Sequence, residues 1–376
     1  MPCHIGGYAH IIPLIVLSCM LDDRSFEKVF FLSKHAKDHY EPFYQKYNIR
    51  VSRVDADGTI LAAAKACEAF APDVIVDDFS YTAGFLRQLN GLPRVTIQRT
   101  GSFPHESRIE SGFVHSSGLD EHKLPKRVPD GLVPPRSIAD LFDAEAKVVP
   151  GVRSAEVLPE RLKQDRTYSF CGPLLLSDIE VTSALRLFLD KNKNRKKVYV
   201  TYGSAQKPPE EIIPCLQQIA ERDIAIITNV ESEELAGAFP DSYYYEGYLP
   251  MNFVCSQADI VIHHCGNATY HYPIMHLKRT IVLGTGCYDR EIVALRLRDL
   301  QVAHYVPSPK STTTFGKKFQ SAFERVIHEG RQREVDRVER QKALLSEIKR
   351  TKNRFSFHDI LSQAVRFNTV SSRRDS

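Results

Sequence analysis

The chain has 376 residues, of which 43% are hydrophobic and 26% charged, a composition that excludes disordered, collagen-like and coiled-coil chains. No uninterrupted run of about 18 apolar residues exists, which excludes a membrane-spanning helix. The formal net charge of +4, from 50 Lys and Arg against 46 Asp and Glu, gives no reason to expect a nucleic-acid partner.

Short, β-branched and almost wholly apolar stretches alternate with helix-like stretches in both halves of the chain. In the first half the sequence predicts strands over 26–33, 49–54, 73–78 and 94–98, with helices over 60–70 and 81–89 between them. In the second half it predicts strands over 197–201, 223–228, 259–263, 280–283 and 303–306. Such strands are typical of parallel sheets covered on both faces. The chain is therefore expected to form two doubly wound α/β domains.

Residues 101–173 separate the two halves and contain eight prolines without such alternation. We expect an irregular region on the acceptor side that runs into an interdomain linker. The predicted domains are 1–173 and 174–350, followed by a basic helix or tail over 351–376. From Lys317 to Ser376 there are 15 basic and 8 acidic residues. This end is expected to form a solvated helix face, and weak contact with an anionic membrane surface is the alternative.

The cysteines and the N-terminal stretch bear on the compartment. The eight cysteines are scattered, never form a CxxC pair and lie mostly in apolar stretches, which favours buried thiols in a reducing cytosol. Residues 11–21 could pass for the core of a signal peptide. However, no Lys or Arg precedes them, Pro13 interrupts them, and Asp22 follows in place of a small-residue cleavage site. A cytoplasmic location is expected, with secretion as the alternative.

Three predicted junctions into helices carry glycine and small polar residues: 6–10, 202–205 and 263–269. In parallel sheets ligands bind beyond the carboxyl ends of strands, and backbone N–H groups at a helix start can hold an anion. The last two junctions share one domain and predict one pyrophosphate site. The helix after 202–205 is expected to have Pro208 and Glu210 in its first turn. The alternatives are ordinary turns and a metal site that uses His263, His264, Cys265, His271 and His276.

In the first predicted domain, a histidine lies at the start of a helix and two aspartates lie at the end of a strand. His10 opens a helix expected to start near Ile11, and Asp77 and Asp78 end the predicted strand over 73–78. A histidine and a carboxylate at strand ends of one sheet can meet as a general base and its orienting partner. The simpler interpretations are a structural histidine and an aspartate that caps the following helix.

Five segments, in order along the chain, resemble motifs of GT-B nucleotide-sugar glycosyltransferases. The likeness is greatest to bacterial natural-product UDP-glycosyltransferases of the macrolide and antibiotic type. AHIIPLIVLSCML resembles the motif with the catalytic histidine, and APDVIVDDFSYTAGFLRQLNGLPRV resembles the segment that supplies its carboxylate partner. SFCGPLLL resembles the entry to the second domain, VYVTYGS a strand-to-glycine-serine junction, and GYLPMNFVCSQADIVIHHCGNAT the donor-binding signature.

The resemblance implies a GT-B fold, in which two Rossmann-like parallel-sheet domains face a cleft. It implies inverting transfer of a sugar from a UDP- or dTDP-linked donor to a hydroxyl of a small lipophilic or lipid acceptor, without a metal ion or other cofactor. His10 would be the catalytic base and Asp78 its partner. The donor would be bound by Gly203, Ser204, Leu249 (through its backbone), His264, Gly266, Asn267, Ala268, Thr269, Asp289 and Arg290.

The chain departs from the family pattern at four places. Cys265 replaces the first glycine of the HGG motif, Tyr272 replaces a glutamate that binds ribose, and Arg290 replaces a glutamine. Only Met1–Ile5 precede the loop over 6–10 that leads to His10, so the first strand is expected to be truncated, with a start further upstream as the alternative. Two alternatives therefore stay open: another GT-B activity, such as a nucleotide-sugar epimerase or a lipid-linked sugar transferase, or a non-catalytic homologue that acts as a binding or scaffold protein.

Overall fold

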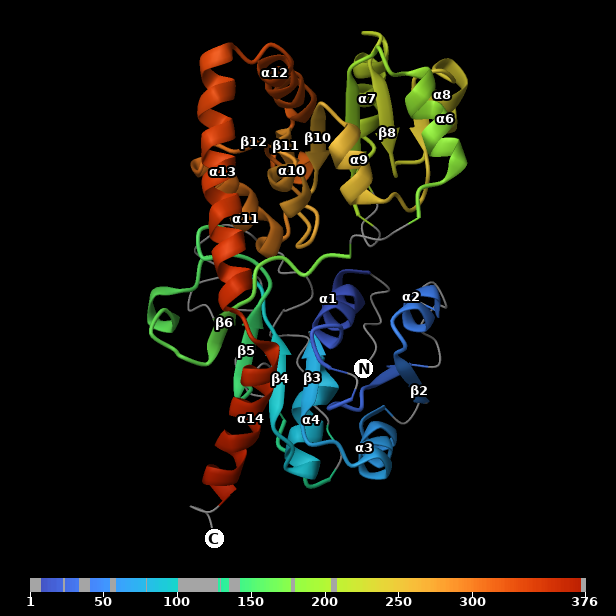
Figure 1. Ribbon diagram of the computed structural model, residues 1–376. Coiled ribbons are helices and arrows are strands. Elements are labelled where there is room, and N and C mark those ends of the chain that lie inside the picture. Colours follow the sequence, from blue (N-terminus) through green and yellow to red (C-terminus); the bar gives the residue numbers. More distant parts are fainter. Residues whose placement is uncertain are drawn as a thin grey trace. The chain divides into compact units, whose positions relative to one another are not determined.

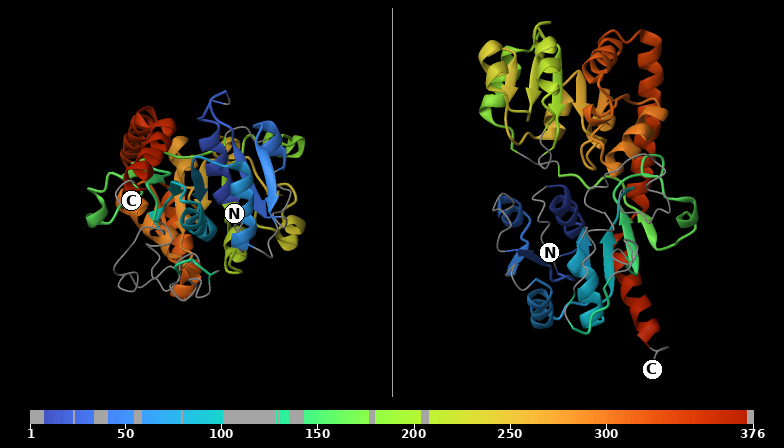
Figure 2. Two further views of the ribbon diagram at one scale, coloured as in Figure 1. Left: turned by 90° about the horizontal axis from the view of Figure 1, so that it is seen from below. Right: turned by 180° about the vertical axis from the view of Figure 1, so that it is seen from behind.

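The structure is a computed structural model, shown in Figures 1 and 2. It describes residues 8–22, 24–33, 41–54, 59–78, 80–100, 128, 130–134, 143–176, 180–203 and 208–372. These residues divide into two compact units. Unit 1 takes the described residues up to 100, those from 128 to 175 and those from 350 to 372, and unit 2 takes those from 176 to 349.

The described strands of unit 1 are all parallel. β1 (Val29–Ser33) pairs with β2 (Arg50–Val54). A four-stranded sheet has the order β3 (Ile75–Asp78), β4 (Arg94–Ile97), β5 (Ala146–Val149) and β6 (Tyr168–Phe170). Every residue of β4 and β5 is buried. This burial explains why these strands lack the alternation of polar and apolar residues that a half-exposed strand shows.

The helices of unit 1 are α1 (Tyr8–Ser18), α2 (Glu41–Lys46), α3 (Thr59–Phe70), α4 (Tyr81–Asn90) and α14 (Phe357–Ser372), with the 3-10 helix η5 (Glu160–Leu162). The helix α14 runs beside β4 and β5 (Figure 1). Its side chains Phe357, Ile360, Leu361 and Ala364 join one hydrophobic cluster with β4 and β5. The segment expected as a basic C-terminal helix or tail thus supplies part of the core of unit 1.

Unit 2 contains a six-stranded parallel sheet with the order β12-β11-β10-β7-β8-β9. The strands are β7 (Lys197–Thr201), β8 (Ala225–Thr228), β9 (Tyr243–Tyr245), β10 (Ile260–His263), β11 (Arg279–Leu283) and β12 (His304–Val306). This is the strand order of a Rossmann sheet, which reverses between β7 and β10. Ligands of such sheets bind outside the carboxyl ends of the strands at that reversal.

The helices of unit 2 are α6 (Ser183–Lys191), α7 (Ile212–Ala220), α8 (Glu233–Ala238), α9 (Met251–Gln257), α10 (His271–Met275), α11 (Tyr288–Asp299), α12 (Phe315–Ile327) and α13 (Arg331–Arg354), with η6 (Pro309–Ser311). Helices α12 and α13 lie side by side in Figure 1 and in the right-hand view of Figure 2. Arg337 and Gln341 of α13 donate hydrogen bonds to the carbonyls of Leu277 and Lys278, which directly precede β11. Residues of α13 from Arg350 onward belong to unit 1.

All nine predicted strands are present, with ends that differ by at most three residues. The region 101–173 was wrongly expected to be irregular throughout, because β5 and β6 lie within it. Both strands lie in the proline-rich stretch without strand–helix alternation, and Lys147 interrupts the apolar residues of β5. β9 was not predicted either.

Two helix starts differ from the prediction. α1 begins at Tyr8 rather than near Ile11, so His10 lies in its first turn. α7 begins at Ile212, so Pro208 and Glu210 precede it. The N–H groups of Ile212 and Ile213 donate to the carbonyls of Pro209 and Glu210, which are turn-type bonds over three residues. Within the described ranges, none of the helices combines the length and the hydropathy that crossing a membrane requires.

Candidate functional site

In unit 1 the structure brings together His10 and Asp78, which are 68 residues apart in sequence. His10 lies in the first turn of α1, and Asp78 is the last residue of β3, against which α1 packs. Nδ1 of His10 lies 3.1 Å from Oδ1 of Asp78. The side chain of Asp78 is fully buried, whereas that of His10 is 17% exposed. An imidazole held at one nitrogen and partly accessible has the arrangement of a general base with its orienting carboxylate.

Asp78 has a second partner, Arg99, which the sequence analysis did not single out. Arg99 follows β4 and donates through Nη1 to Oδ1 and through Nη2 to Oδ2 of Asp78. Burial alone would raise the pKa of Asp78, but the charge of Arg99, with His10, holds it below the ordinary value. Near neutral pH Asp78 is therefore an acceptor only. It follows that Nδ1 of His10 is the donor in this hydrogen bond.

The neighbouring carboxylate, Asp77, has a different set of partners because successive strand residues point to opposite faces. It accepts from Nε and Nη2 of the buried Arg94 at 2.7 and 3.0 Å. It also accepts from the backbone N–H of Ser80, the N-cap of α4, at 3.0 Å. Asp77 therefore supports the start of α4, and Asp78 is the aspartate that faces His10.

In unit 2 the second and third predicted junctions are neighbours. β7 and β10 pair in parallel with Thr201 opposite His263, so the residues after both strands lie at one edge of the sheet. Gly203 has φ +68°, in the left-handed region that favours glycine. Asn229 closes this turn: its Oδ1 accepts from the N–H of Tyr202 at 3.2 Å, and its Nδ2 donates to the carbonyl of Gly203 at 2.8 Å. The predicted donor-binding residue Ser204 lies outside the described residues.

The ring of His264 fills the space between two glycines. A Cβ atom at Gly203 would lie 2.8 Å from Cε1 of His264, and one at Gly266 would lie 2.7 Å from Nε2. The ring is buried and stacked on Tyr202, with 6.0 Å between ring centroids. Burial, and then the charge of Arg290, hold the pKa of His264 well below its ordinary value, so the ring is neutral. His264 therefore sets the spacing of the two junctions and brings no positive charge.

The backbone after His264 offers hydrogen-bond donors. Cys265 has φ +58°, and its N–H donates to Nδ1 of His263 at 3.0 Å. In the described part of the chain, no hydrogen-bond partner is found for the next three N–H groups, those of Gly266, Asn267 and Ala268. Thr269 instead donates back to the carbonyl of Gly266 at 2.9 Å. Consecutive N–H groups in a turn with a left-handed residue form a concave anion site. Since α10 has only five residues, backbone N–H groups rather than a helix dipole would act on an anion here.

Leu249 and Tyr272 are the two positions that the family resemblance relates to the nucleoside, and they differ in whether their polar groups have partners. Leu249 is buried, and among the described residues its backbone N–H and C=O have no hydrogen-bond partner. Its backbone thus keeps the capacity to bond a base. Tyr272 is buried and donates its hydroxyl to the carbonyl of Leu176 at 3.2 Å. The position of the family's ribose-binding glutamate therefore holds an internal contact in this chain.

The predicted donor-binding residues Asp289 and Arg290 lie in the first turn of α11. Glu291, which the sequence analysis did not single out, holds the loop before them. Its Oε1 accepts from the N–H groups of Thr285 and Gly286, both at 2.7 Å, and its Oε2 accepts from the hydroxyl of Tyr305 at 2.5 Å. The charge of Arg290 acts on His264, which places a cation near the glycine junctions.

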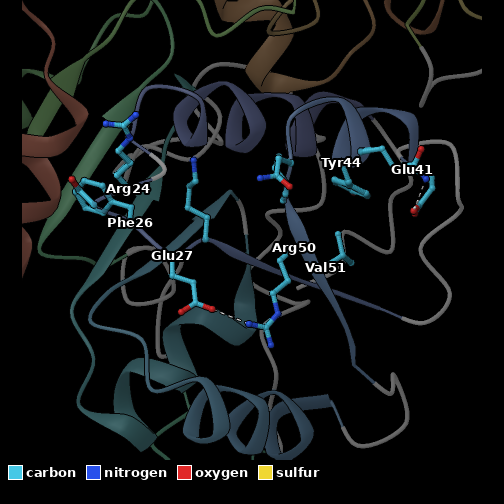
Figure 3. Close-up of a pocket in the computed structure, with 12 residues that line it drawn as sticks. Arg24, Phe26, Glu27, Glu41, Tyr44, Arg50 and Val51 are labelled. Atoms are coloured by element: carbon cyan, nitrogen blue, oxygen red, sulfur yellow. Dashed lines mark hydrogen bonds and ion pairs between the residues drawn. The ribbon is translucent and has the colours of Figure 1, made fainter.

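Two other kinds of site were compared with the predicted residues: groups of possible metal ligands and a surface cavity. Among the described residues, no group of three or more His, Cys, Asp or Glu side chains is arranged to hold a metal ion. Unit 1 has a cavity of about 710 Å³, lined by residues before β1, in and after α2, and at the start of β2. Figure 3 shows the side chains that line it. One lining residue, Lys28, donates to the carbonyl of Ser18 at the C-terminal end of α1. His10 lies in the first turn of that helix, away from this cavity.

Comparisons with known proteins show the fold. No protein-family model matches the sequence, and no match was found among curated proteins. A glycosyltransferase of kitacinnamycin is similar in structure, with TM-score 0.68, 18% identity and coverage of 97% of this chain and 96% of that chain. The spinosyn forosaminyltransferase has TM-score 0.69, 15% identity and 96% coverage of both chains. The calicheamicin glycosyltransferase has TM-score 0.63, 14% identity, and 95% and 96% coverage. The expected GT-B fold is thereby confirmed.

Proposed function

We propose that the protein is an inverting glycosyltransferase that moves a sugar from a UDP- or dTDP-linked donor to a hydroxyl of a small lipophilic acceptor. The observation that carries the proposal is the pair of His10 and the buried Asp78, 3.1 Å apart, in a fold shared with sugar transferases. The names of the similar structures, on kitacinnamycin, spinosyn and calicheamicin, support a natural product as the acceptor class.

In the proposed reaction, Nε2 of His10 takes the proton of the acceptor hydroxyl while its oxygen attacks the anomeric carbon. The bond from that carbon to the diphosphate oxygen breaks, and the electron pair leaves with the nucleoside diphosphate. Asp78 stabilises the imidazolium. The N–H groups of 266–268 and the cation of Arg290 stabilise the charge that develops on the diphosphate. A single displacement inverts the anomeric centre.

The test has a binding arm and a transfer arm. Thermal unfolding is compared in buffer, UDP, dTDP and ADP, because a ligand at 100 times its Kd adds about 2.7 kcal/mol of stability. We expect a shift with UDP or dTDP and not with ADP. His10→Ala is expected to abolish transfer and to keep the nucleotide shift, and His328→Ala, at an exposed histidine, serves as the matched control. Turnover that survives His10→Ala would refute the assignment of the base.

The same assay separates the alternatives. A nucleotide-sugar epimerase would change the sugar of the donor without an acceptor. A non-catalytic homologue would show no turnover, and a protein whose altered motif has lost the nucleotide would show no shift at all. We propose that no metal ion is required, because backbone donors and Arg290 serve the diphosphate. Turnover is therefore expected to be unchanged in EDTA.

We also propose a cytoplasmic location and weak contact with an anionic membrane surface. The cysteines of the described residues are free thiols, five of them buried, which supports a reducing compartment. Along α13 the only exposed acidic residue is Glu339, whereas the exposed basic ones are Arg331, Arg333, Arg340, Lys342, Lys349, Arg350, Lys352 and Arg354. Basic residues near an anionic surface contribute about 1 kcal/mol each. Salt-sensitive sedimentation with phosphatidylserine vesicles, but not with phosphatidylcholine vesicles, is the expected result.

A further inference from the structure

The pairing of Asp78 with Arg99 concerns a charge that the proposed reaction needs. β3 and β4 pair in parallel with Asp78 opposite Ile97. Because side chains alternate along a strand, Arg99 continues the face of Ile97 and Asp78, and Arg94 lies on the other face with Asp77. Each aspartate at the end of β3 thus has its own arginine. Both arginines are almost fully buried, so the two pairs are matched in burial and chemistry and differ in the face they serve.

We infer that Arg99 is a positioning residue that holds the carboxylate of Asp78 in orientation for His10, and that the charge of Arg99 contributes to the pH dependence of the proposed reaction. This inference rests on the proposed function only in assigning the base role to His10. A buried carboxylate without its cation takes up a proton more readily. The arginine also grips both carboxylate oxygens, which leaves Oδ1 in place to accept the Nδ1–H of His10.

The charges that act on Asp78 can be named from each packed element. His10 comes from α1 and Arg99 from the end of β4. The thiol of Cys171, which also senses the charge of Arg99, stays neutral because burial raises its pKa. Glu156 is engaged with Thr100, the residue after Arg99. The positive charge of Arg99 and the negative charge of Asp78 cancel, so this pair places no net charge beside His10.

Removal of the cation is therefore expected to raise the proton affinity of the His10–Asp78 pair. The direction is the same whether the added proton sits on the imidazole or on the carboxylate, because the two groups titrate as a coupled pair. An opposite charge at this range shifts titration by roughly 1–3 pH units. In Arg99→Met, the acid limb of the pH–rate profile should move upward by at least about one unit, and turnover should recover at alkaline pH.

The experiment compares Arg99→Met, Arg99→Lys and Arg94→Met in the full chain. Two readouts are taken: the pH–rate profile of sugar transfer and the NMR titration midpoint of the His10 ring, assigned with His10→Ala. Arg94→Met should lower the melting temperature without moving either midpoint, since it removes a buried arginine from the other face. Arg99→Lys, which keeps the charge and loses the two-pronged contact, should keep the midpoint while turnover falls.

The outcomes separate the inference from the proposed function. If the NMR titration midpoint of the His10 ring moves upward in Arg99→Met and in neither of the other two variants, the role of Arg99 is supported. That result stands even if no acceptor is glycosylated, and in that case only the proposed function is refuted. Equal midpoints in Arg99→Met and the unaltered chain would overturn the inference. So would an equal shift in Arg94→Met or Arg99→Lys. If Arg99→Met does not fold, Arg99→Lys decides, because a shifted midpoint in that variant contradicts the role of the charge.

Discussion

The close packing of the His264 ring between Gly203 and Gly266 gives a quantitative prediction for a substitution at Gly203. Gly203→Ala adds a Cβ 2.8 Å from Cε1 of His264, so the ring must withdraw by about 0.6 Å to reach the 3.4 Å of an ordinary contact. Such overpacking costs about 1–3 kcal/mol. The φ of +68° adds about 1–2 kcal/mol for a residue with a side chain. The predicted loss in the free energy of unfolding is thus about 2–5 kcal/mol.

A double-mutant cycle identifies the origin of this loss. In a His264→Ala background, Gly203→Ala should cost only the backbone part, about 1–2 kcal/mol. Gly237→Ala in α8 is the matched control, because no atom lies within 4 Å of a Cβ there, and it should stabilise by about 0.5–1 kcal/mol. Urea unfolding followed by circular dichroism suits a chain without tryptophan. Equal costs of Gly203→Ala in both backgrounds would refute the placement of the ring.

Three further predictions concern buried polar groups. The pKa of Asp78 is lowered in the folded state, so the stabilisation that Asp78 contributes is present above the unfolded value of about 3.9 and is lost as pH falls through the folded value. The free energy of unfolding, measured with urea, should therefore fall more steeply with decreasing pH in the unaltered chain than in Asp78→Asn. Equal slopes would contradict this. Tyr272→Phe should lose about 1 kcal/mol with its bond to Leu176, and the UDP-induced thermal shift should stay unchanged, whereas a smaller shift would mean that the tyrosine meets the nucleoside. Glu291→Gln replaces charge-assisted bonds with neutral ones and should cost about 1–2 kcal/mol; it should also raise the KM for the donor, and an unchanged KM would show that the loop it holds does not serve the donor.

The strands and the positions of the junctions followed from the sequence because buried parallel strands leave a local mark, a run of apolar and β-branched residues. KVYVT and DIVIH are such runs, and they became the adjacent strands β7 and β10. The pairing of His10 with Asp78 was predicted by the family resemblance. Arg99 was missed because nothing in QRTGS distinguishes it from a solvated arginine. Only the register of β3 with β4 places it beside Asp78.

The same limit applies to Glu291 and Tyr272. Glu291 stands in a polar helix start, where an exposed glutamate is common, and its burial depends on a close approach of Gly284 that is set in three dimensions. Tyr272 was identified as a departure from the family pattern, but its contact with Leu176 joins residues 96 positions apart. Substitutions at a motif position are visible in a sequence, whereas the new contacts that compensate for them are not.

The place of α14 in the core of unit 1 has a consequence for how the chain matures. Phe357, Ile360, Leu361 and Ala364 are made after all of 176–349, yet they pack with strands from the first half of the chain. At roughly 5–20 residues per second, synthesis of the intervening segment takes about 10–40 s. During that interval the apolar side chains of β4 and β5 lack their final cover. Unit 2, whose strands are continuous in sequence, can complete its own sheet first, so the part of the chain that is made first is the last to be finished.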